Sequence, residues 1–161
     1  MHNQKVFRLT QSALIAAMYI ALTLLSNAFG LASGPVQVRL SEILTVLPYF
    51  TPAAIPGLFV GCLLSNLLTG CVVWDVVCGS VATLLGAVGT YLLRKYKWFA
   101  PLPPILCNTL IVPFVLQYAC GAEKALPFLM LTVGLGEVVS AGIPGMLLLL
   151  ALERYDLFKK L

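Results

Sequence analysis

Residues 43–74 read ILTVLPYFTPAAIPGLFVGCLLSNLLTGCVVW and contain no charged side chain. A membrane-spanning helix needs only about 20 apolar residues, so this stretch is too long for a single span. Three prolines interrupt it, and a proline inside a helix removes a backbone donor and kinks or ends the helix. They are Pro48, Pro52 and Pro56. We therefore predict a short helix over residues 38–50 and a second helix over residues 53–69.

The composition of the whole chain agrees with this. Of the 161 residues, 60% are hydrophobic and 10% are charged, whereas a soluble domain carries about 25% charged residues. So few charges could not cover the surface of a soluble protein of this size. We predict an all-α polytopic membrane protein whose residues 1–161 form one membrane domain in the lipid bilayer.

The basic residues indicate the topology. Eight of the ten Lys and Arg residues form three groups, namely Lys5 with Arg8; Arg94, Lys95 and Lys97; and Arg154, Lys159 and Lys160. Short cytoplasmic loops collect positive charge, so we expect all three groups, and both termini, on the cytoplasmic side of the cell membrane. Each interval between groups then holds an even number of spans. The six predicted spans are 9–29, 38–50, 53–69, 73–93, 99–119 and 126–152.

The sequence lacks the motifs of nucleic-acid-binding proteins, of metal or redox sites and of nucleotide-binding enzymes. No basic stretch is interleaved with aromatic residues, so we expect no nucleic-acid partner. The five cysteines contain no C-x-x-C pair, and the lone histidine is His2 in the N-terminal tail. There is no phosphate-binding loop of the G-x-x-x-x-G-K-[ST] type. We expect no enzyme activity, no cofactor and no metal, and any work must draw its energy from elsewhere.

Four charged residues fall inside predicted spans. They are Arg39, Glu42, Asp75 and Glu137. A charge at mid-bilayer costs at least ~2.5–3.5 kcal/mol, so it tends to face a cavity or a partner. In the six-span topology all four lie in the outer half of the bundle. These charges also have structural interpretations that do not involve a ligand. Arg39 could pair with Glu42 or with Glu137, and Asp75 could be a charge favoured by the dipole of its helix.

Polar and aromatic side chains in the same spans complete a predicted pocket. The amides are Asn66 and Asn108, and the aromatic residues are Trp74 and Tyr49. Each amide alone is more often an interhelical hydrogen bond, but together with the carboxylates they resemble the make-up of a small-molecule site. Such a pocket suits a flat heterocycle with several N–H donors, or an amine cation, since charge-assisted hydrogen bonds are strong.

Small residues recur at four-residue spacing, which lets helices approach closely in lipid. The three sets are Ala13, Ala17 and Ala21; Gly57, Gly61 and Ser65; and Ala141 with Gly145. We expect most of them to pack inside the chain. The alanine face differs because it lies on a terminal helix, where it could dock a separate protein.

Four stretches resemble the QueT family. They are VRLSEILTVLPYFTPAAIPGLFVG at 38–61, DVVCGSVATLL at 75–85, APLPP at 100–104 followed by Asn108, and LTVGLGE at 131–137. The resemblance runs through nearly the whole chain in order. QueT proteins are substrate-binding S components of energy-coupling factor (ECF) transporters and are assigned to uptake of queuosine precursors, which are 7-deazaguanines such as preQ1, preQ0 or queuine.

The resemblance implies an S component with six membrane helices and a substrate site near the outer face, under the loop between the first two helices. It implies the transmembrane coupling protein EcfT and two cytoplasmic ATPases as partners, with EcfT contacting Ala13, Ala17 and Ala21. The residues of this chain that fall in the matching motifs are Arg39, Glu42, Asp75, Asn108 and Glu137. Substrate transfer is expected to involve rotation of the S component in the membrane.

Other functions remain open at this point. The chain could be an S component for a different vitamin-like compound, because such proteins share a fold and differ in their pockets. It could be a membrane scaffold whose buried charges only pair with one another. A membrane enzyme is the least favoured alternative, since no nucleophile–base pair is visible. Ligand binding by the isolated protein separates the transporter readings from the scaffold.

Overall fold

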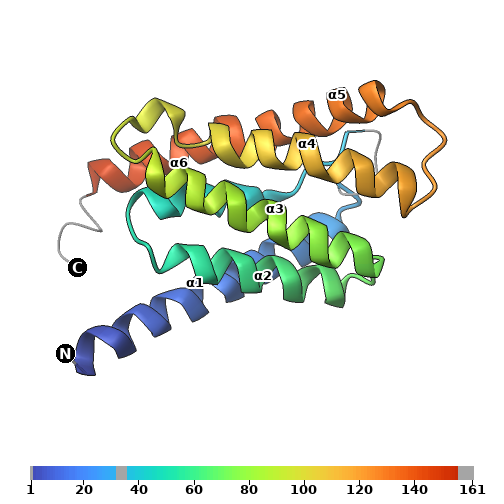
Figure 1. Ribbon diagram of the computed structural model, residues 1–161. Helices are drawn as coiled ribbons and strands as arrows, with labels where there is room; N and C mark the ends of the chain where they lie inside the picture. The colour runs from blue at the N-terminus through green and yellow to red at the C-terminus, as the bar shows by residue number, and fades with distance from the viewer. Residues whose placement is uncertain (1, 32–35, 156–161) are drawn as a thin grey trace.

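The computed structural model describes residues 2–31 and 36–155, and every regular element in this part of the chain is a helix (Figure 1). The α-helices are α1 (His2–Ala28), α2 (Ala54–Leu68), α3 (Val73–Leu92), α4 (Leu102–Tyr118), α5 (Leu126–Glu137) and α6 (Ile143–Arg154). Two 3₁₀ helices, η1 (Leu40–Tyr49) and η2 (Lys97–Phe99), and a π-helical segment, η3 (Val138–Gly142), complete the set. The all-α prediction is confirmed for these residues.

Four helical runs are long and apolar enough to cross a membrane. They are Gln4–Ala28, Val73–Leu92, Lys97–Tyr118 and Leu126–Arg154, the last of which joins α5, η3 and α6. The helices η1 and α2 are also apolar but shorter. The chain is therefore a helical membrane protein. Helices are present in each of the six predicted ranges, with α1 beginning well before residue 9.

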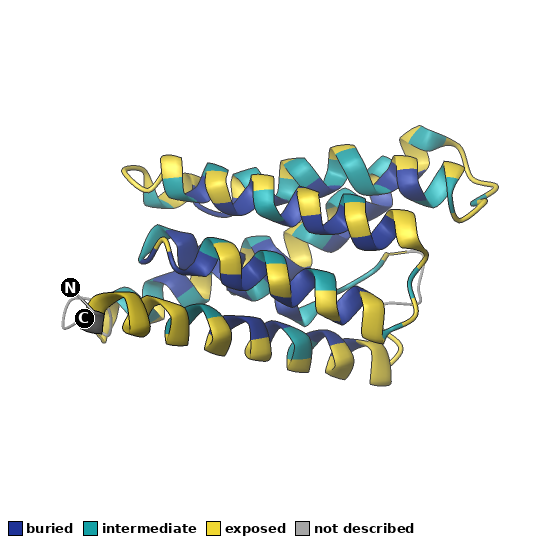
Figure 2. Ribbon diagram, turned by 60° about the horizontal axis from the view of Figure 1, so that its bottom comes forward, coloured by how far each residue is buried: buried dark blue, intermediate teal, exposed yellow. Residues whose placement is uncertain are grey.

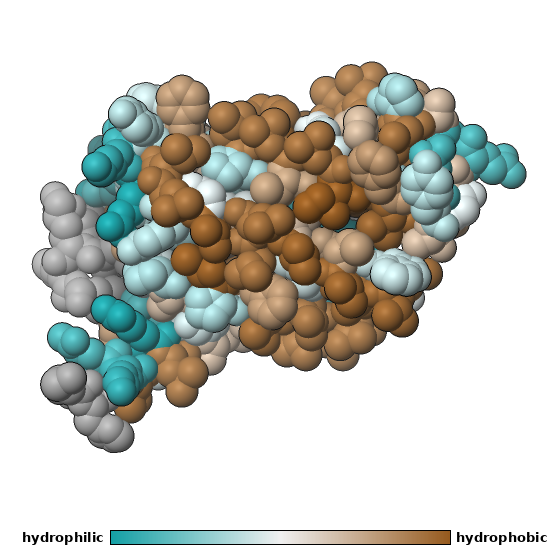
Figure 3. Space-filling view, viewed as in Figure 1, coloured by the Kyte–Doolittle hydropathy of each residue, from teal (hydrophilic) through white to brown (hydrophobic). Residues whose placement is uncertain are grey.

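The distribution of polarity is the inverse of that in a soluble protein. Large apolar side chains such as Leu14, Leu110 and Leu147 are exposed, whereas Asn66 and Thr83 are buried. Figure 2 shows exposed stripes along the outer faces of the helices, and Figure 3 shows apolar side chains across the middle of the molecule with hydrophilic ones mainly towards its ends. Lipid can solvate such a surface, and the interior is left for polar groups.

Small residues bring helices into close contact, as their spacing predicts. A Cβ atom added at Gly61 would lie 2.8 Å from the Cβ of Tyr19, so α2 approaches the backbone of α1 at this point. A Cβ added at Gly145 would lie 3.0 Å from Val46, where α6 meets η1. Both contacts lie within the chain, which confirms the expectation for these two sets of small residues.

The last helical run changes its winding at η3, and the sequence explains why. Pro144 follows this segment, and a proline inside a helix has no N–H for the carbonyl four residues earlier. Local π-type winding absorbs such a defect and is common at functional sites. The change in winding begins directly after Glu137. The predicted helix over residues 126–152 is therefore present as one continuous helical run, with this π-helical segment inside it.

The three basic groups gather at one end of the bundle. In Figure 1 the start of α1, the end of α6 and the loop after α3 lie at the same end. Hydrogen bonds join the end of α6 to the loop after α3 and to the end of η1, because Glu153 accepts from both Lys97 (3.3 Å) and Tyr49 (3.0 Å). The described basic residues of all three groups belong to these segments, whereas Lys159 and Lys160 lie outside the described residues.

Candidate ligand-binding site

The start of η1 is held by side chains from two other helices. The first backbone N–H groups of a helix have no partner within it. Here the N–H of Arg39 donates to the Oγ of Ser140 (3.1 Å), and the N–H of Leu40 donates to the Oγ of Ser26 (2.8 Å). These two serines, from η3 and α1, fix the point at which η1 enters the bundle.

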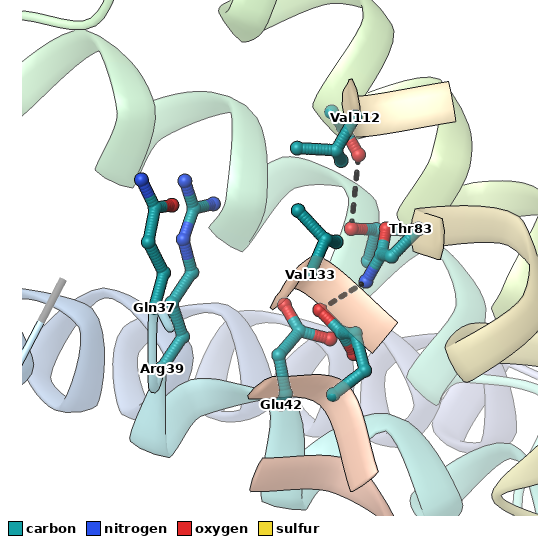
Figure 4. A pocket seen from close by; sticks show the side chains of 9 residues that line it. Gln37, Arg39, Glu42, Thr83, Val112 and Val133 are labelled. Atoms are coloured by element: carbon teal, nitrogen blue, oxygen red, sulfur yellow. Dashed lines mark hydrogen bonds between the residues drawn. The ribbon is translucent and has the colours of Figure 1, made fainter. Parts of the chain in front are cut away.

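A small cavity lies beside this point, among η1, α3, α4 and α5. It is lined by Gln37, Arg39, Glu42, Gly79, Thr83, Asn108, Val112, Val133 and Glu137 (Figure 4). Its volume is about 20 Å³, which is room for about one water molecule. The sequence predicts Arg39, Glu42, Asn108 and Glu137 in one pocket, and the structure brings these four residues together.

Two glutamates give the cavity its chemistry. Glu42 is 2% exposed, and its Oε1 accepts a hydrogen bond from the hydroxyl of Tyr19. The Oε1 of Glu137 accepts a hydrogen bond from the Nδ2 of Asn108 at 3.0 Å. The Oε2 atoms of both glutamates are buried, and neither accepts a hydrogen bond from the described residues. In each glutamate, Oε1 thus accepts a hydrogen bond from a neighbouring side chain, whereas Oε2 has no hydrogen-bond donor among the described residues.

Arg39 forms its ion pair with a residue on another helix. Its Nη2 lies 3.8 Å from the Oδ2 of Asp75 in the first turn of α3. The pairings with Glu42 or Glu137 that the sequence left open are not found among the described residues. The backbone explains this, because Arg39 precedes η1 in an extended conformation (φ −110°, ψ 110°). Figure 4 shows the Arg39 side chain running beside Gln37 and away from Glu42.

This arrangement favours ligands that donate hydrogen bonds. A buried carboxylate without a partner is costly, because it has lost water and gained nothing in return. N–H groups of a ligand, or a positive charge, would satisfy the free oxygens with strong charge-assisted bonds. The site therefore has the chemistry expected for a donor-rich or cationic small molecule.

Comparison with known proteins assigns the chain that carries this site to a family. The sequence model of the QueT transporter family matches residues 9–154. The chain belongs to the QueT transporter family. The family is one of transporters rather than enzymes, and all residues that line the cavity fall inside the matched range.

One curated relative is named for the substrate that it transports. The chain is 31% identical over 99 residues to a protein of Lactococcus lactis subsp. cremoris (strain MG1363) named "Queuosine precursor transporter QueT". The match covers 60% of this chain and 57% of that protein, so it spans little more than half of the relative's length. No solved structure matches the chain.

Four of the eight residues predicted for the pocket do not line this cavity. They are Asp75, which pairs with Arg39, and Asn66, Trp74 and Tyr49. Asn66 is 1% exposed and lies behind the cavity wall, with its Nδ2 3.5 Å from the carbonyl oxygen of Asp75. Trp74 is 67% exposed and lines an open groove with Phe114 and Tyr118. Tyr49 is at the far end of η1, and a 3₁₀ helix rises about 2.0 Å per residue, so ten residues separate the two ends by roughly 20 Å.

The placements of Trp74 and Tyr49 correct the predicted pocket. Helix positions could be predicted, but the face that each residue presents could not. Trp74 follows the loop at the start of α3 and faces outward, while Tyr49 bonds to Glu153 at the basic end. Neither residue lines the cavity.

Two further residues shape the site although the predicted pocket did not include them. Tyr19 carries a signal in the sequence, since a tyrosine in the middle of a membrane helix is unusual and tyrosines favour the membrane interfaces. Thr83 carries one too, because Asp75, Gly79 and Thr83 follow one another at four-residue spacing and so share one face of α3. With these two patterns, Tyr19 and Thr83 could have been predicted from the sequence as residues of the pocket.

Proposed function

We propose that the chain is the S component of an ECF transporter that imports a queuosine precursor of the 7-deazaguanine class. The observation that carries the proposal is the pair of buried carboxylates, Glu42 and Glu137, which keep one free oxygen each in a single cavity. Membership of the QueT transporter family supports transport, and the name of the Lactococcus relative supports the substrate class.

Glu137 and Asn108 suit the edge of a guanine-like ring. That edge presents adjacent N–H donors next to a carbonyl oxygen. A carboxylate can accept two parallel N–H bonds, and a neighbouring amide N–H can donate to the carbonyl. In the cavity wall, the Nδ2 of Asn108 already lies 3.0 Å from the Oε1 of Glu137. In this proposal the cavity widens when substrate enters, because ligand sites are typically hundreds of Å³ in volume.

We also propose six membrane spans, with η1 and α2 as the two short ones. The ten residues of η1 rise about 20 Å and the fifteen of α2 about 22 Å, less than the roughly 30 Å of a bilayer core. In this proposal the residues that flank the two helices, 36–39, 50–53 and 69–72, complete the crossing. The gathering of basic residues at one end supports an orientation with both termini in the cytoplasm. The cavity would then lie nearer the outer face.

The energy for import would come from partners, which we propose are EcfT and two cytoplasmic ATPases. The alanine face of α1 is the proposed contact with EcfT. Ala13, Ala17 and Ala21 are all exposed, whereas Ile15 and Tyr19 on the other face are buried. Figure 2 shows α1 at the edge of the bundle with a long exposed face. Small exposed side chains on a membrane helix allow close docking of another helix.

Equilibrium binding tests the proposed function. The detergent-purified protein would be titrated with queuine and with 7-aminomethyl- and 7-cyano-7-deazaguanine, with thiamin and riboflavin as controls. We expect at least one deazaguanine to bind and neither vitamin to do so. Glu137→Gln should weaken binding about tenfold or more, because a charge-assisted bond is lost, whereas Glu123→Gln in the exposed loop should not. Unchanged affinity in a folded Glu137→Gln protein would contradict the role of Glu137.

A further inference from the structure

The cavity contains more negative than positive charge. Glu42 and Glu137 both line it, and Arg39 is the one basic residue among those that do. The guanidinium of Arg39 is already engaged by Asp75 at 3.8 Å. If all four side chains are ionised, two negative charges are left without a cationic partner. The described residues supply no second cation at this place.

Hydrogen-bond acceptors are also in excess. The hydroxyl of Tyr19 and the amide of Asn108 are each committed to one oxygen of a glutamate. The hydroxyl of Thr83 donates to the carbonyl of Gly79 at 3.0 Å. The Gln37 side chain extends beside Arg39, away from Glu42 (Figure 4). Both Oε2 atoms are buried and accept no hydrogen bond from the described residues.

Such a surplus favours a ligand that is itself a cation. An unpaired carboxylate in a membrane interior is among the most costly groups in a protein, and removing one partner of a buried pair is strongly destabilising. A bound ammonium group would supply both the missing charge and up to three donors. A neutral ligand of the same shape would leave the second carboxylate uncompensated.

We propose that the site takes its substrate as an amine cation, with the Glu42 carboxylate as the counter-ion of the ammonium group. This rests on the proposed function and names the substrate within it. Glu42 is the better counter-ion because it is the more deeply buried, and because Asn108 beside Glu137 makes that pair suited to the guanine-like edge. The 7-aminomethyl compound and queuine carry such an amine, whereas the 7-cyano compound does not.

The alternative explanation is that one of the two glutamates is protonated. A proton on Glu42 or Glu137 would remove the surplus charge without any ligand cation. The groups that bear on this are Tyr19 on α1, Arg39 beside the site, Cys62 on α2, Asp75 on α3, Asn108 on α4 and Glu137 on α5. In that case neutral and cationic ligands of one shape would bind about equally, so the comparison of two such ligands decides between the explanations.

The test measures dissociation constants for 7-aminomethyl- and 7-cyano-7-deazaguanine with the wild-type protein and with Glu42→Gln. We expect the wild type to bind the aminomethyl compound about tenfold or more tightly than the cyano compound. In Glu42→Gln this preference should fall to within about threefold, mostly through loss of affinity for the amine. The control variant Glu123→Gln should keep the full preference.

A second comparison guards against misfolding of Glu42→Gln. The wild-type protein alone would be titrated with the 7-hydroxymethyl analogue, which is neutral and close in shape to the aminomethyl compound, and a similar preference for the amine is expected. Equal affinity for the amine and its neutral analogues would overturn the inference while leaving the proposed function intact. Failure of every deazaguanine to bind folded protein would overturn the proposed function itself, and the inference with it.

Discussion

The hydroxyl of Tyr19 donates a hydrogen bond to Oε1 of Glu42, and both side chains are almost completely buried. This bond joins the first helix of the chain to the wall of the cavity. The same helix carries Ala17 and Ala21 on its exposed face. One helix therefore contacts the candidate site on one side and offers the proposed docking surface on the other.

Removing this bond should weaken the site. In Tyr19→Phe, Oε1 of Glu42 loses its donor, and leaving a buried group unsatisfied costs about 1–3 kcal/mol. We expect a lower melting temperature in detergent and about tenfold weaker binding of the deazaguanine substrate. Tyr118→Phe is the control, because Tyr118 is 78% exposed. Wild-type affinity and stability in Tyr19→Phe would show that Glu42 does not need this donor.

The amide of Asn108 should matter through Glu137. Asn108→Ala removes the donor that holds Oε1 of Glu137, so the carboxylate loses its orientation. We predict a substrate dissociation constant raised about tenfold, measured by titration of protein whose fold is verified by its melting curve. Asn27→Ala provides the matched control, since Asn27 is exposed at the end of α1. The role of Asn108 is refuted if both variants bind alike.

A methyl group at Gly136 should disturb the entry to η1. An added Cβ would overlap the carbonyl oxygen of Gln37, so the segment that carries Arg39 would have to move. Overpacking of this kind costs about 1–3 kcal/mol, and we expect Gly136→Ala to lower both stability and substrate affinity. Gly142→Ala should be tolerated, because its nearest neighbour would be Ile105 at an ordinary 3.5 Å. Equal melting temperatures for the two variants would contradict this packing.

A bulky residue on the alanine face should separate binding from transport. Ala17→Trp would block close approach of another helix but leave the cavity untouched. We expect normal substrate affinity in the isolated protein, together with loss of co-purification with EcfT and loss of uptake by cells. Ala151→Trp on α6, another exposed alanine, serves as the control. If Ala17→Trp still assembles and transports, the docking surface lies elsewhere.

The orientation of the chain can be tested with Cys120. It is an exposed cysteine in the loop between α4 and α5, at the end of the bundle away from the three basic groups. In a variant that keeps Cys120 as its single cysteine, a membrane-impermeant maleimide should label intact cells. A variant whose single cysteine is Tyr96→Cys, at the basic end, should react only after permeabilisation. The reverse pattern would invert the proposed topology.

Much of the architecture follows from the sequence alone. A chain with 60% hydrophobic and 10% charged residues must use lipid as its solvent, and in lipid the backbone must satisfy its own hydrogen bonds, which leaves helices. The prolines of residues 43–74 mark where these helices are interrupted. The rarity of charge inside membranes also singles out Arg39, Glu42 and Glu137 in the sequence, because each buried charge needs a reason to be there.

The partners of these charges were decided only by tertiary structure. The extended backbone at Arg39 directs its side chain to Asp75 rather than to Glu42 three residues away. Tyr19 became part of the site because the glycines of α2 let α1 pack close to the bundle, and Tyr49 left it because η1 carries it to the opposite end. Periodicity predicts that a helix forms, but the rotation and depth of each helix depend on contacts between residues far apart in the chain, which no local pattern encodes.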